Sequence, residues 1–404
     1  MMDEIVGMRI GDPCPTRIMG VINLSEESFY KGSVASGDKV VERASIMVEE
    51  GADMIDVGAR STAPGVRQIS VQEEKERLLP VLKDVLGVGV PISVDTQYSE
   101  IAEEALDMGA CITNDVSGLK TDPRMVDVIS DFKAIAILMA SKEKPGDCLT
   151  FPEIKASLVD SIALAEGKGI SKIIIDPGIG RWVKEKTYEY NLAIISGLER
   201  LRVLGKPILV AISRKSFIGD VLGIPDPSDR LAGTLACTAI AVHKGAHIVR
   251  THDVKETKDV IRMAEAIRGR QIITEKGDHQ VITIDYLKNP EDSVELMRSI
   301  DVTETGTRIM KEKTVSRVML IKNVTASEAL IIKQEMLARG GDAAIPMGTI
   351  SGEVKRADVL IIGTILQINS LIKKLKTQSL NLPVISNLLR ETLAKEQDVK
   401  YLYR

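Results

Sequence analysis

Cysteine is scarce in this chain of 404 residues, and the four cysteines, Cys14, Cys111, Cys148 and Cys237, lie far apart. None forms the CxxC spacing of a zinc site, and the scattered thiols do not indicate a disulfide framework. The sequence therefore predicts neither a structural zinc nor disulfides, and it fits the reducing environment of the cytoplasm.

Long apolar runs and concentrated charge are also missing. No apolar run reaches the roughly 18 residues of a membrane-spanning helix, and the N-terminus lacks a charged-then-apolar signal pattern. A formal net charge of −4 without a long basic tract gives no reason to expect nucleic acid. We therefore expect a cytoplasmic globular protein, and the length favours two domains unless the first is a large α/β barrel.

The most informative stretch is KPILVAISRKSFIG, at residues 206–219. Its apolar run, residues 208–212, predicts a strand buried on both faces, and the run ends abruptly at two cations, Arg214 and Lys215. In a parallel α/β fold, the loops beyond the strand carboxyl ends form the ligand site. A single such pair would more often be a solvated basic turn. Repetition of the same pattern along the chain favours the ligand site.

Strands are predicted at residues 17–22, 54–57, 91–94, 111–113, 134–139, 172–175, 208–212 and 246–249. Helical patterns separate them, and the alternation continues for about 250 residues, the usual length of a (β/α)8 TIM barrel. A doubly wound open sheet is the alternative, but eight repeats favour closure.

Polar side chains follow seven of the eight predicted strands; only the strand at 134–139 ends without one. The set at the strand ends is Asn23, Asp56, Asp95, Asn114, Asp176, Lys215, Arg250 and His252. In a closed barrel these side chains converge on one mouth. Any one of them has a simpler explanation as a helix cap, and we keep that explanation for Asp115 and Asp253.

At this point the sequence resembles a known family. The segments IMGVINLSEESF, GADMIDVGARSTAPG, ISVDT, GACITNDVSG, IIIDPGIG, SRKSFIG, DRLAGTLA and VRTHDVKET look like the successive signatures of dihydropteroate synthases, across residues 15–270. The resemblance implies a pterin-binding barrel that joins 6-hydroxymethyl-7,8-dihydropterin diphosphate to an arylamine, and releases diphosphate with Mg2+ bound to the leaving group. It also implies folate-type biosynthesis and a homodimer.

The resemblance assigns roles to the strand-end residues. Pterin-binding residues would be Asp95, Asn114, Asp176 and Lys215, with Asp56, Asp95 and Lys215 catalytic. Diphosphate would contact Asn23, Arg250 and His252, and Asn23 would be the Mg2+ ligand. The arylamine would lie near Lys31, Arg60, Thr62, Pro64, Arg181 and Ser216, where a helix N-terminus can bind an anionic group.

The chain departs from the family in the loops around the arylamine. Lys31 stands where Asp is usual, Arg60 where Glu is usual, and Ala63 where Arg is usual. Arg181 replaces a Phe and is followed by Trp182 and a short insertion, and the His expected near Ala140 is absent. Three changes add positive charge. One hypothesis is an arylamine with an extra anion, such as a phosphorylated aryl riboside of methanopterin-type biosynthesis. The alternative is that Arg60 replaces the lost Arg, while Lys31 and Arg181 are solvated.

Two other functions stay open. Pterin-dependent methyltransferases share this barrel, although Lys215 and the pair Arg250 and His252 favour a diphosphate leaving group. A pterin-binding protein without synthase activity is the third possibility, suggested by the altered loops.

After residue 270 the sequence changes character. Residues 271–314 are polar and interrupted, which indicates a connector with local strands and a short helix. Residues 315–404 predict a small α/β domain with helices at 327–339, 365–376 and 387–395. NVTASEALIIKQEMLARGGDAA and ADVLIIGT resemble a companion domain fused to some bacterial dihydropteroate synthases, there at the other end of the chain. A structural or dimer-forming role is expected for it.

Overall fold

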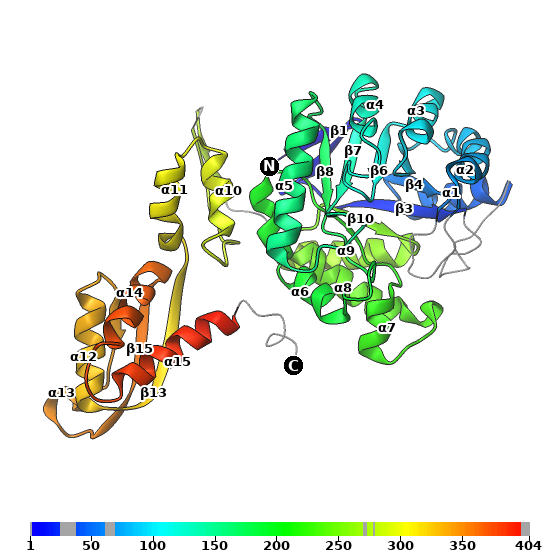
Figure 1. Cartoon of the computed structure of the whole chain (residues 1–404). Helices are drawn as coiled ribbons and strands as arrows, with labels where there is room; N and C mark the ends of the chain where they lie inside the picture. Colours follow the sequence, from blue (N-terminus) through cyan, green and yellow to red (C-terminus); the bar gives the residue numbers. More distant parts are fainter. Residues whose placement is uncertain (1, 25–37, 61–68, 270–272, 278, 397–404) are drawn as a thin grey trace. The chain divides into compact units, whose positions relative to one another are not determined.

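The computed structural model of the chain describes residues 2–24, 38–60, 69–269, 273–277 and 279–396. The chain divides into two compact units, Met1–Thr283 and Ile284–Arg404, and Figure 1 labels most of their helices and several of their strands. The division lies inside the connector predicted at residues 271–314. Among the described residues, no helix is both long enough and apolar enough to cross a membrane.

The first unit contains a barrel of eight parallel strands. They are β3 (Arg17–Asn23), β4 (Met54–Gly58), β5 (Ile92–Asp95), β6 (Ile112–Asp115), β7 (Ile135–Met139), β8 (Ile173–Asp176), β9 (Leu209–Ala211) and β10 (Ile248–Thr251). Their order is β8-β7-β6-β5-β4-β3-β10-β9. A parallel bridge between Ile175 and Ile208 joins the two end strands. The predicted (β/α)8 barrel is confirmed.

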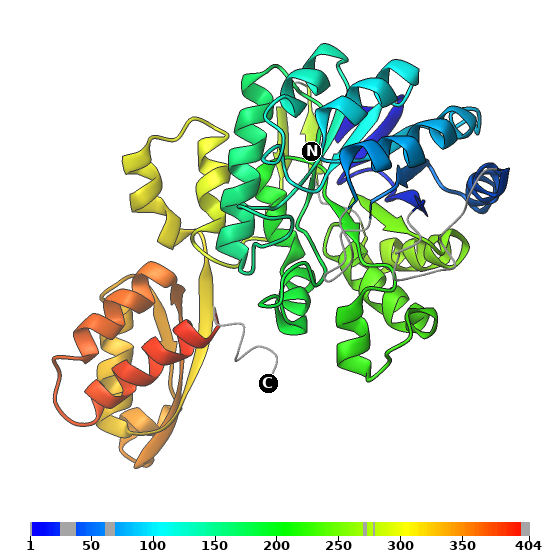
Figure 2. The same ribbon diagram turned by 45° about the vertical axis from the view of Figure 1, so that its right-hand side comes forward.

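Helices connect successive strands and surround them (Figure 2). They are α1 (Asp38–Glu50), α2 (Val71–Val85), α3 (Ser99–Met108), α4 (Met125–Asp131), α5 (Phe151–Gly167), α6 (Tyr188–Ser196), α7 (Ser216–Leu222), α8 (Leu231–His243) and α9 (Val254–Arg268), with 3-10 turns at Leu198–Leu204 and Pro227–Arg230. Helix α2 illustrates how the local sequence determines where a helix begins and which face it buries. Ser70 and Glu73 form a capping box at its start, and an apolar stripe including Leu78 and Leu82 is buried.

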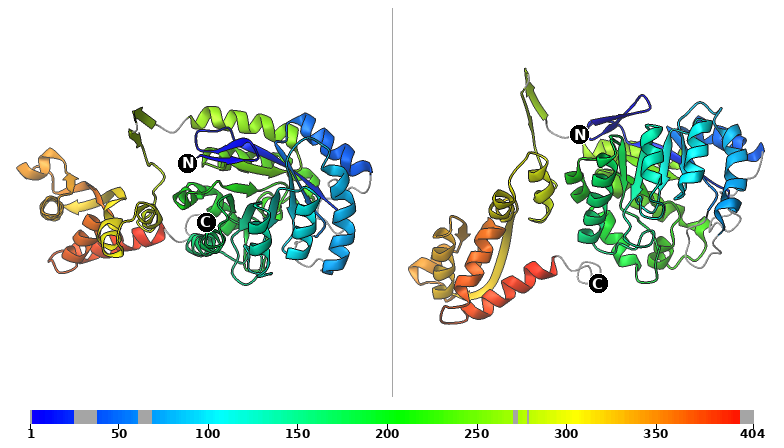
Figure 3. Two further views of the ribbon diagram at one scale, coloured as in Figure 1. Left: turned by 90° about the horizontal axis from the view of Figure 1, so that it is seen from above. Right: turned by 45° about the horizontal axis from the view of Figure 1, so that its top comes forward.

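A hairpin precedes the barrel and was not predicted. Strands β1 (Met2–Ile5) and β2 (Met8–Gly11) pair antiparallel, and Figure 3 shows them in dark blue. Ile10 is fully buried. It packs with residues near the N-terminal ends of the barrel strands, among them Met19, Met54, Ile112, Ile135, Leu209 and Ile248. Ile10 therefore fills the end of the barrel opposite the strand carboxyl ends.

The second unit is a small α/β domain. Its sheet has the antiparallel order β13 (Ser316–Thr325), β15 (Arg356–Thr364), β14 (Asp342–Ala344). Its helices are α10 (Asp292–Arg298), α11 (Glu304–Met310), α12 (Ala326–Leu337), α13 (Met347–Ser351), α14 (Ile365–Leu375) and α15 (Leu382–Lys395), with a 3-10 turn at Lys311–Lys313. The hairpin β11 (Ile273–Lys276) and β12 (His279–Ile282) belongs to the first unit.

We predict that Ile10→Ala lowers the free energy of unfolding of the first unit by about 2–4 kcal/mol, because a fully buried side chain leaves a cavity. Denaturant unfolding measures the loss. Val281→Ala, at a side chain that is 71% exposed, is the control and should change stability by no more than about 0.5 kcal/mol. Equal effects of the two substitutions would show that the hairpin does not seal the barrel.

Candidate active site

A cluster of four polar side chains lies at the carboxyl ends of the strands. Arg250 of β10 donates from Nε to Asp56 Oδ2 at 2.6 Å and from Nη2 to Asp95 Oδ2 at 2.9 Å. Asn114 donates from Nδ2 to Asp56 Oδ2 at 3.1 Å. Strand β10 pairs with β3 and β9, whereas the two carboxylates come from β4 and β5. Arg250 therefore reaches past β3 and links non-adjacent strands. We call these four residues the Arg250 cluster.

Burial and mutual charge set the protonation of this cluster. Burial, together with the charge of Asp56, raises the pKa of Asp95 to about 7, and Arg250 opposes that rise. Burial alone would lower the pKa of Arg250, but the charges of Asp56 and Asp95 raise it above its usual value. Asp95 therefore changes charge near neutral pH.

Asp56 offers an acceptor to a ligand. Its side chain is fully buried, and its Oδ1 atom has no hydrogen-bond partner among the described residues. A buried acceptor without a donor costs about 1–3 kcal/mol. The arrangement indicates that a bound molecule or water supplies the missing N–H or O–H group.

Asp176 and Lys215 are charged groups that act on each other electrostatically. Asp176 ends β8 and accepts a hydrogen bond from the Gly178 backbone N–H at 2.7 Å. Burial raises its pKa, and the charge of Lys215 opposes the rise. Burial lowers the pKa of Lys215 to about 8, with Asp176 opposing. The Lys215 ammonium donates to the Ile179 carbonyl, and lies 5.3 Å from the centre of the Trp182 ring.

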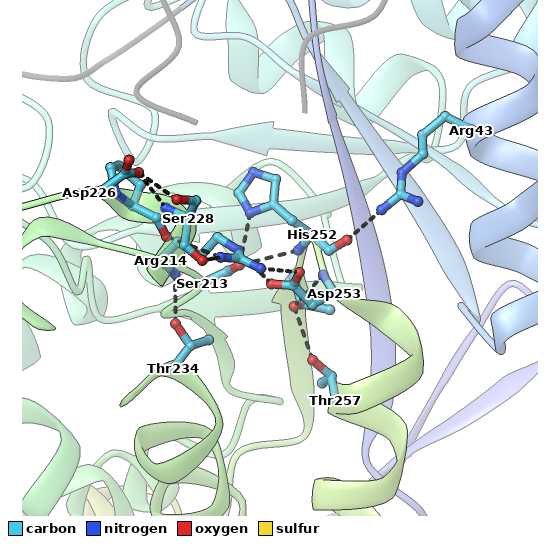
Figure 4. Close-up of polar contacts among 11 residues, drawn as sticks. Arg43, Ser213, Arg214, Asp226, Ser228, Thr234, His252, Asp253 and Thr257 are labelled. Atoms are coloured by element: carbon cyan, nitrogen blue, oxygen red, sulfur yellow. Dashed lines mark hydrogen bonds and ion pairs between the residues drawn. The ribbon is translucent and has the colours of Figure 1, made fainter. Parts of the chain in front are cut away.

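His252 is a neutral imidazole held by Ser213. Its Nδ1 atom lies 2.8 Å from Ser213 Oγ, which also accepts the His252 backbone N–H at 3.3 Å, as Figure 4 shows. The Ser213 oxygen has two lone pairs, so its hydroxyl can donate to Nδ1 or accept from it, and the ring proton can lie on either nitrogen. Burial and the charge of Arg250 lower the pKa of His252 to about 3. The ring is therefore uncharged at neutral pH.

Arg214 supports the loop that carries Lys215. Its guanidinium binds both oxygens of Asp253, with Nε to Oδ2 at 2.9 Å and Nη2 to Oδ1 at 2.7 Å (Figure 4). Its backbone has a φ of 55°, and its N–H donates to Thr234 Oγ1 at 2.9 Å.

The capping explanation for Asp253 is wrong, because its carboxylate makes no cap hydrogen bond at the start of α9. Asp115 does not cap a helix either: it binds backbone N–H groups of the turn that follows β6, and α4 begins only at Met125, after Arg124.

Arg60 is held in a buried ion pair. Its Nε atom lies 2.6 Å from Glu74 Oε2, and the two side chains are 7% and 0% exposed. Thr96 donates to the other Glu74 oxygen at 2.7 Å, and the Arg60 guanidinium lies 5.0 Å from the Tyr98 ring centre. The network connects the loop after β4 with helix α2 and the residue after β5.

The remaining predicted residues are less informative. Asn23 ends β3, Arg181 is exposed, and Ser216 begins α7. Lys31, Thr62 and Pro64 lie outside the described residues. Their assignments remain predictions.

The sequence interpretation missed Glu74 and the role of Arg214. Glu74 had a readable signal, since it precedes Leu78 by four residues and so lies on the apolar stripe of α2. A carboxylate on such a stripe needs a buried partner. Arg214 had no comparable signal, because Asp253 is 39 residues away in the sequence.

We predict opposite shifts of the Asp95 pKa from two substitutions in the Arg250 cluster. Asp56→Asn removes a negative neighbour and lowers the pKa, whereas Arg250→Met removes the opposing cation and raises it by about 1–3 units. NMR titration of labelled aspartate carboxyl groups measures both. Arg124→Met removes an exposed arginine and is the control, with no shift expected. Shifts in the same direction would contradict the electrostatic account of the cluster.

Comparisons with known proteins agree with this geometry. The family model for pterin binding enzymes matches residues 19–252. Dihydropteroate synthase of Bacillus subtilis is 40% identical over 259 residues, which cover 63% of this chain and 90% of the relative. A dihydropteroate synthase of Synechocystis is 37% identical, with 62% and 90% covered.

Solved structures give the same answer. Dihydropteroate synthase of Thermus thermophilus in complex with 4-aminobenzoate is 37% identical, with a TM-score of 0.57, and the match covers 66% of this chain and all of that one. A second structure of the Thermus enzyme, in complex with 6HMPPP, matches with the same TM-score and identity. The order of the barrel strands, the polar residues at their ends and these matches together place the chain in the dihydropteroate synthase family of pterin-binding transferases.

Proposed function

We propose that this protein condenses 6-hydroxymethyl-7,8-dihydropterin diphosphate with p-aminobenzoate and releases diphosphate. The supporting observation is the Arg250 cluster next to Asp176 and Lys215, at the carboxyl ends of the barrel strands. In this reaction the amine nitrogen forms a bond to the exocyclic methylene of the pterin. The carbon–oxygen bond to diphosphate breaks, and the amine loses a proton.

Paired donors and acceptors suit the edge of a reduced pterin. The ring presents an amide, an amino group and ring nitrogens, which need both kinds of partner. Asp95 and Asp176 supply carboxylate acceptors, and Asn114 supplies an amide. The unpartnered Oδ1 of Asp56 supplies one further acceptor. Lys215 supplies a cationic donor from the loop between β9 and α7.

The same residues can stabilise the charges that develop as diphosphate departs. Departure of diphosphate leaves an electron-poor methylene, which the carboxylates of Asp56 and Asp95 stabilise in a partly dry site. Arg250 uses two of its five donors on these carboxylates, so other N–H groups of its guanidinium can face the diphosphate. In the tautomer that carries its proton on Nε2, His252 can donate to the diphosphate without adding charge. An arylamine is already nucleophilic, so no strong base is needed.

A Mg2+ ion bound through the substrate fits the donor set. Among the described residues, no three His, Cys, Asp or Glu side chains form a group that could hold a metal. Mg2+ often takes only one or two protein oxygens and completes its shell with phosphate oxygens and water. The Asn23 amide oxygen at the end of β3 suits that role. When bound, the ion would neutralise charge on the departing diphosphate.

The position of Arg60 favours p-aminobenzoate over an arylamine with an extra phosphate. The hypothesis of an additional anion relied on cations in the surrounding loops. Arg60 is already balanced by buried Glu74, and Arg181 is exposed to solvent. The charge of Arg60 is therefore already balanced by a buried carboxylate, which weakens its attraction for a substrate phosphate.

We predict diphosphate release when the chain is mixed with the pterin diphosphate, Mg2+ and p-aminobenzoate. Lys215→Ala should reduce turnover by about 100- to 1,000-fold, the usual effect of losing one charge-stabilising donor. Lys168→Ala, at an exposed lysine paired with Asp127, is the matched control and should have no effect. A parallel assay uses a phosphorylated aryl riboside.

The outcomes separate the candidate functions. Release with the riboside and not with p-aminobenzoate would make the arylamine assignment wrong. No release with either, while the pterin still binds, would favour a pterin-dependent methyltransferase or a non-catalytic pterin binder.

We also predict that Arg60→Ala destabilises the first unit by about 3–5 kcal/mol, because it leaves buried Glu74 without a partner. The double variant Arg60→Met, Glu74→Met should recover most of that loss. Denaturant unfolding measures stability, and steady-state kinetics measures the KM for p-aminobenzoate. An unchanged KM in the double variant is expected for a structural arginine. A large rise in KM would mean that Arg60 binds the arylamine.

A further inference from the structure

Trp182 is the single tryptophan of the chain and follows the turn that begins at Asp176. The Lys215 ammonium lies 5.3 Å from the centre of its ring, within the range of a cation–π interaction. Trp182 Nε1 donates to the Ile179 carbonyl at 3.4 Å, and Lys215 donates to the same oxygen. The indole and the ammonium are therefore held by one carbonyl group.

Two glycines leave the space that this arrangement needs. A Cβ atom at Gly146 would lie 2.2 Å from the Trp182 ring, so only a bare backbone fits there. A Cβ atom at Gly180 would lie 3.1 Å from Trp182 Nε1 and 3.2 Å from Lys215 Nζ. Both glycines also have positive φ, at 65° and 135°. The indole is thus packed closely between two loops of the barrel mouth.

Lys186 ties those two loops together. Its side chain is fully buried, and its ammonium donates to the Gly146 carbonyl at 3.2 Å and to the Gly178 carbonyl at 2.7 Å. One carbonyl belongs to the loop after β7 and the other to the loop after β8. Lys186 thereby fixes the backbone on which Trp182 packs.

We propose that Trp182 is a positioning residue for Lys215, and that its indole face and the Ile179 carbonyl hold the ammonium charged and in place within the pterin site. The role of Lys215 toward the pterin rests on the proposed function. The contact between Trp182 and Lys215 does not. Trp182 lies in the segment where the sequence departs from the family pattern.

The charge state of Lys215 is sensitive to its surroundings. Burial lowers its pKa to about 8; Asp176 and Asp95 raise it, while Arg250 and Lys186 lower it. The positive charge is therefore present below about pH 8 and is lost as the pH rises through that value. Because an aromatic face favours the cation, removing the indole should lower the pKa further.

The first test compares Trp182→Leu with Trp182→Phe. Trp182→Leu should move the alkaline limb of kcat/KM for the pterin diphosphate to lower pH by about 0.5–1.5 units. In Trp182→Phe the limb should stay close to its wild-type pH, because the phenyl ring keeps an aromatic face next to the ammonium. A structural defect alone would lower activity without moving the limb. Unfolding midpoints establish that both variants are folded. An alkaline limb that stays at the wild-type position in Trp182→Leu would overturn the proposal.

The second test does not depend on turnover. Selective excitation of the single tryptophan in the ligand-free protein should reveal an emission change near pH 8, and Lys215→Met should abolish it. A step that persists in Lys215→Met would arise from another group, such as Lys186, and would overturn the proposal. A step that depends on Lys215, in a protein that releases no diphosphate, would refute the proposed function and leave this inference standing.

Discussion

The contact of Arg250 with Asp56 and Asp95 is the interaction on which the barrel mouth depends. Two carboxylates near each other cannot both stay ionised in a buried site without a cation. Arg250 supplies that cation from β10, reaching past β3 to β4 and β5. It keeps Asp56 hydrogen-bonded and limits the rise of the Asp95 pKa. Asn114 then joins through Asp56, so one guanidinium organises contributions from four strands.

The other buried cations at this end of the barrel have different structural roles. Arg214 and Arg60 are each balanced by one carboxylate, Asp253 and Glu74, and hold loops in place. Lys186 donates to two backbone carbonyls and links two loops. Arg250 binds Asp95, and Lys215 acts electrostatically on Asp176, so these two cations interact with the predicted pterin-binding carboxylates. Arg60, Arg214 and Lys186 therefore hold the surrounding loops, whereas Arg250 and Lys215 belong to the predicted pterin site.

The strands and the polar residues at their ends were predictable, whereas the partners of those residues were not. An apolar run that stops at Asp or Asn is visible in the sequence, as at Ile175 and Asp176. The link between Arg250 and Asp56 spans 194 residues and exists only because the barrel closes. Asp253 was misread as a cap for the same reason. The hairpin containing Ile10 was missed because its strands, MDEI and MRIG, lack the apolar runs that mark the barrel strands. Helix α15 begins at Leu382 instead of residue 387, with Pro383 in its first turn.

The most direct test of the central claim is a crystal structure of this chain with 6-hydroxymethyl-7,8-dihydropterin diphosphate bound. The account predicts the pterin ring edge within hydrogen-bond distance of Asp95, Asn114 and Asp176, with the diphosphate against Arg250 and His252. A pterin bound away from the Arg250 cluster, or a diphosphate bound to Arg60 after displacement of Glu74, would contradict it.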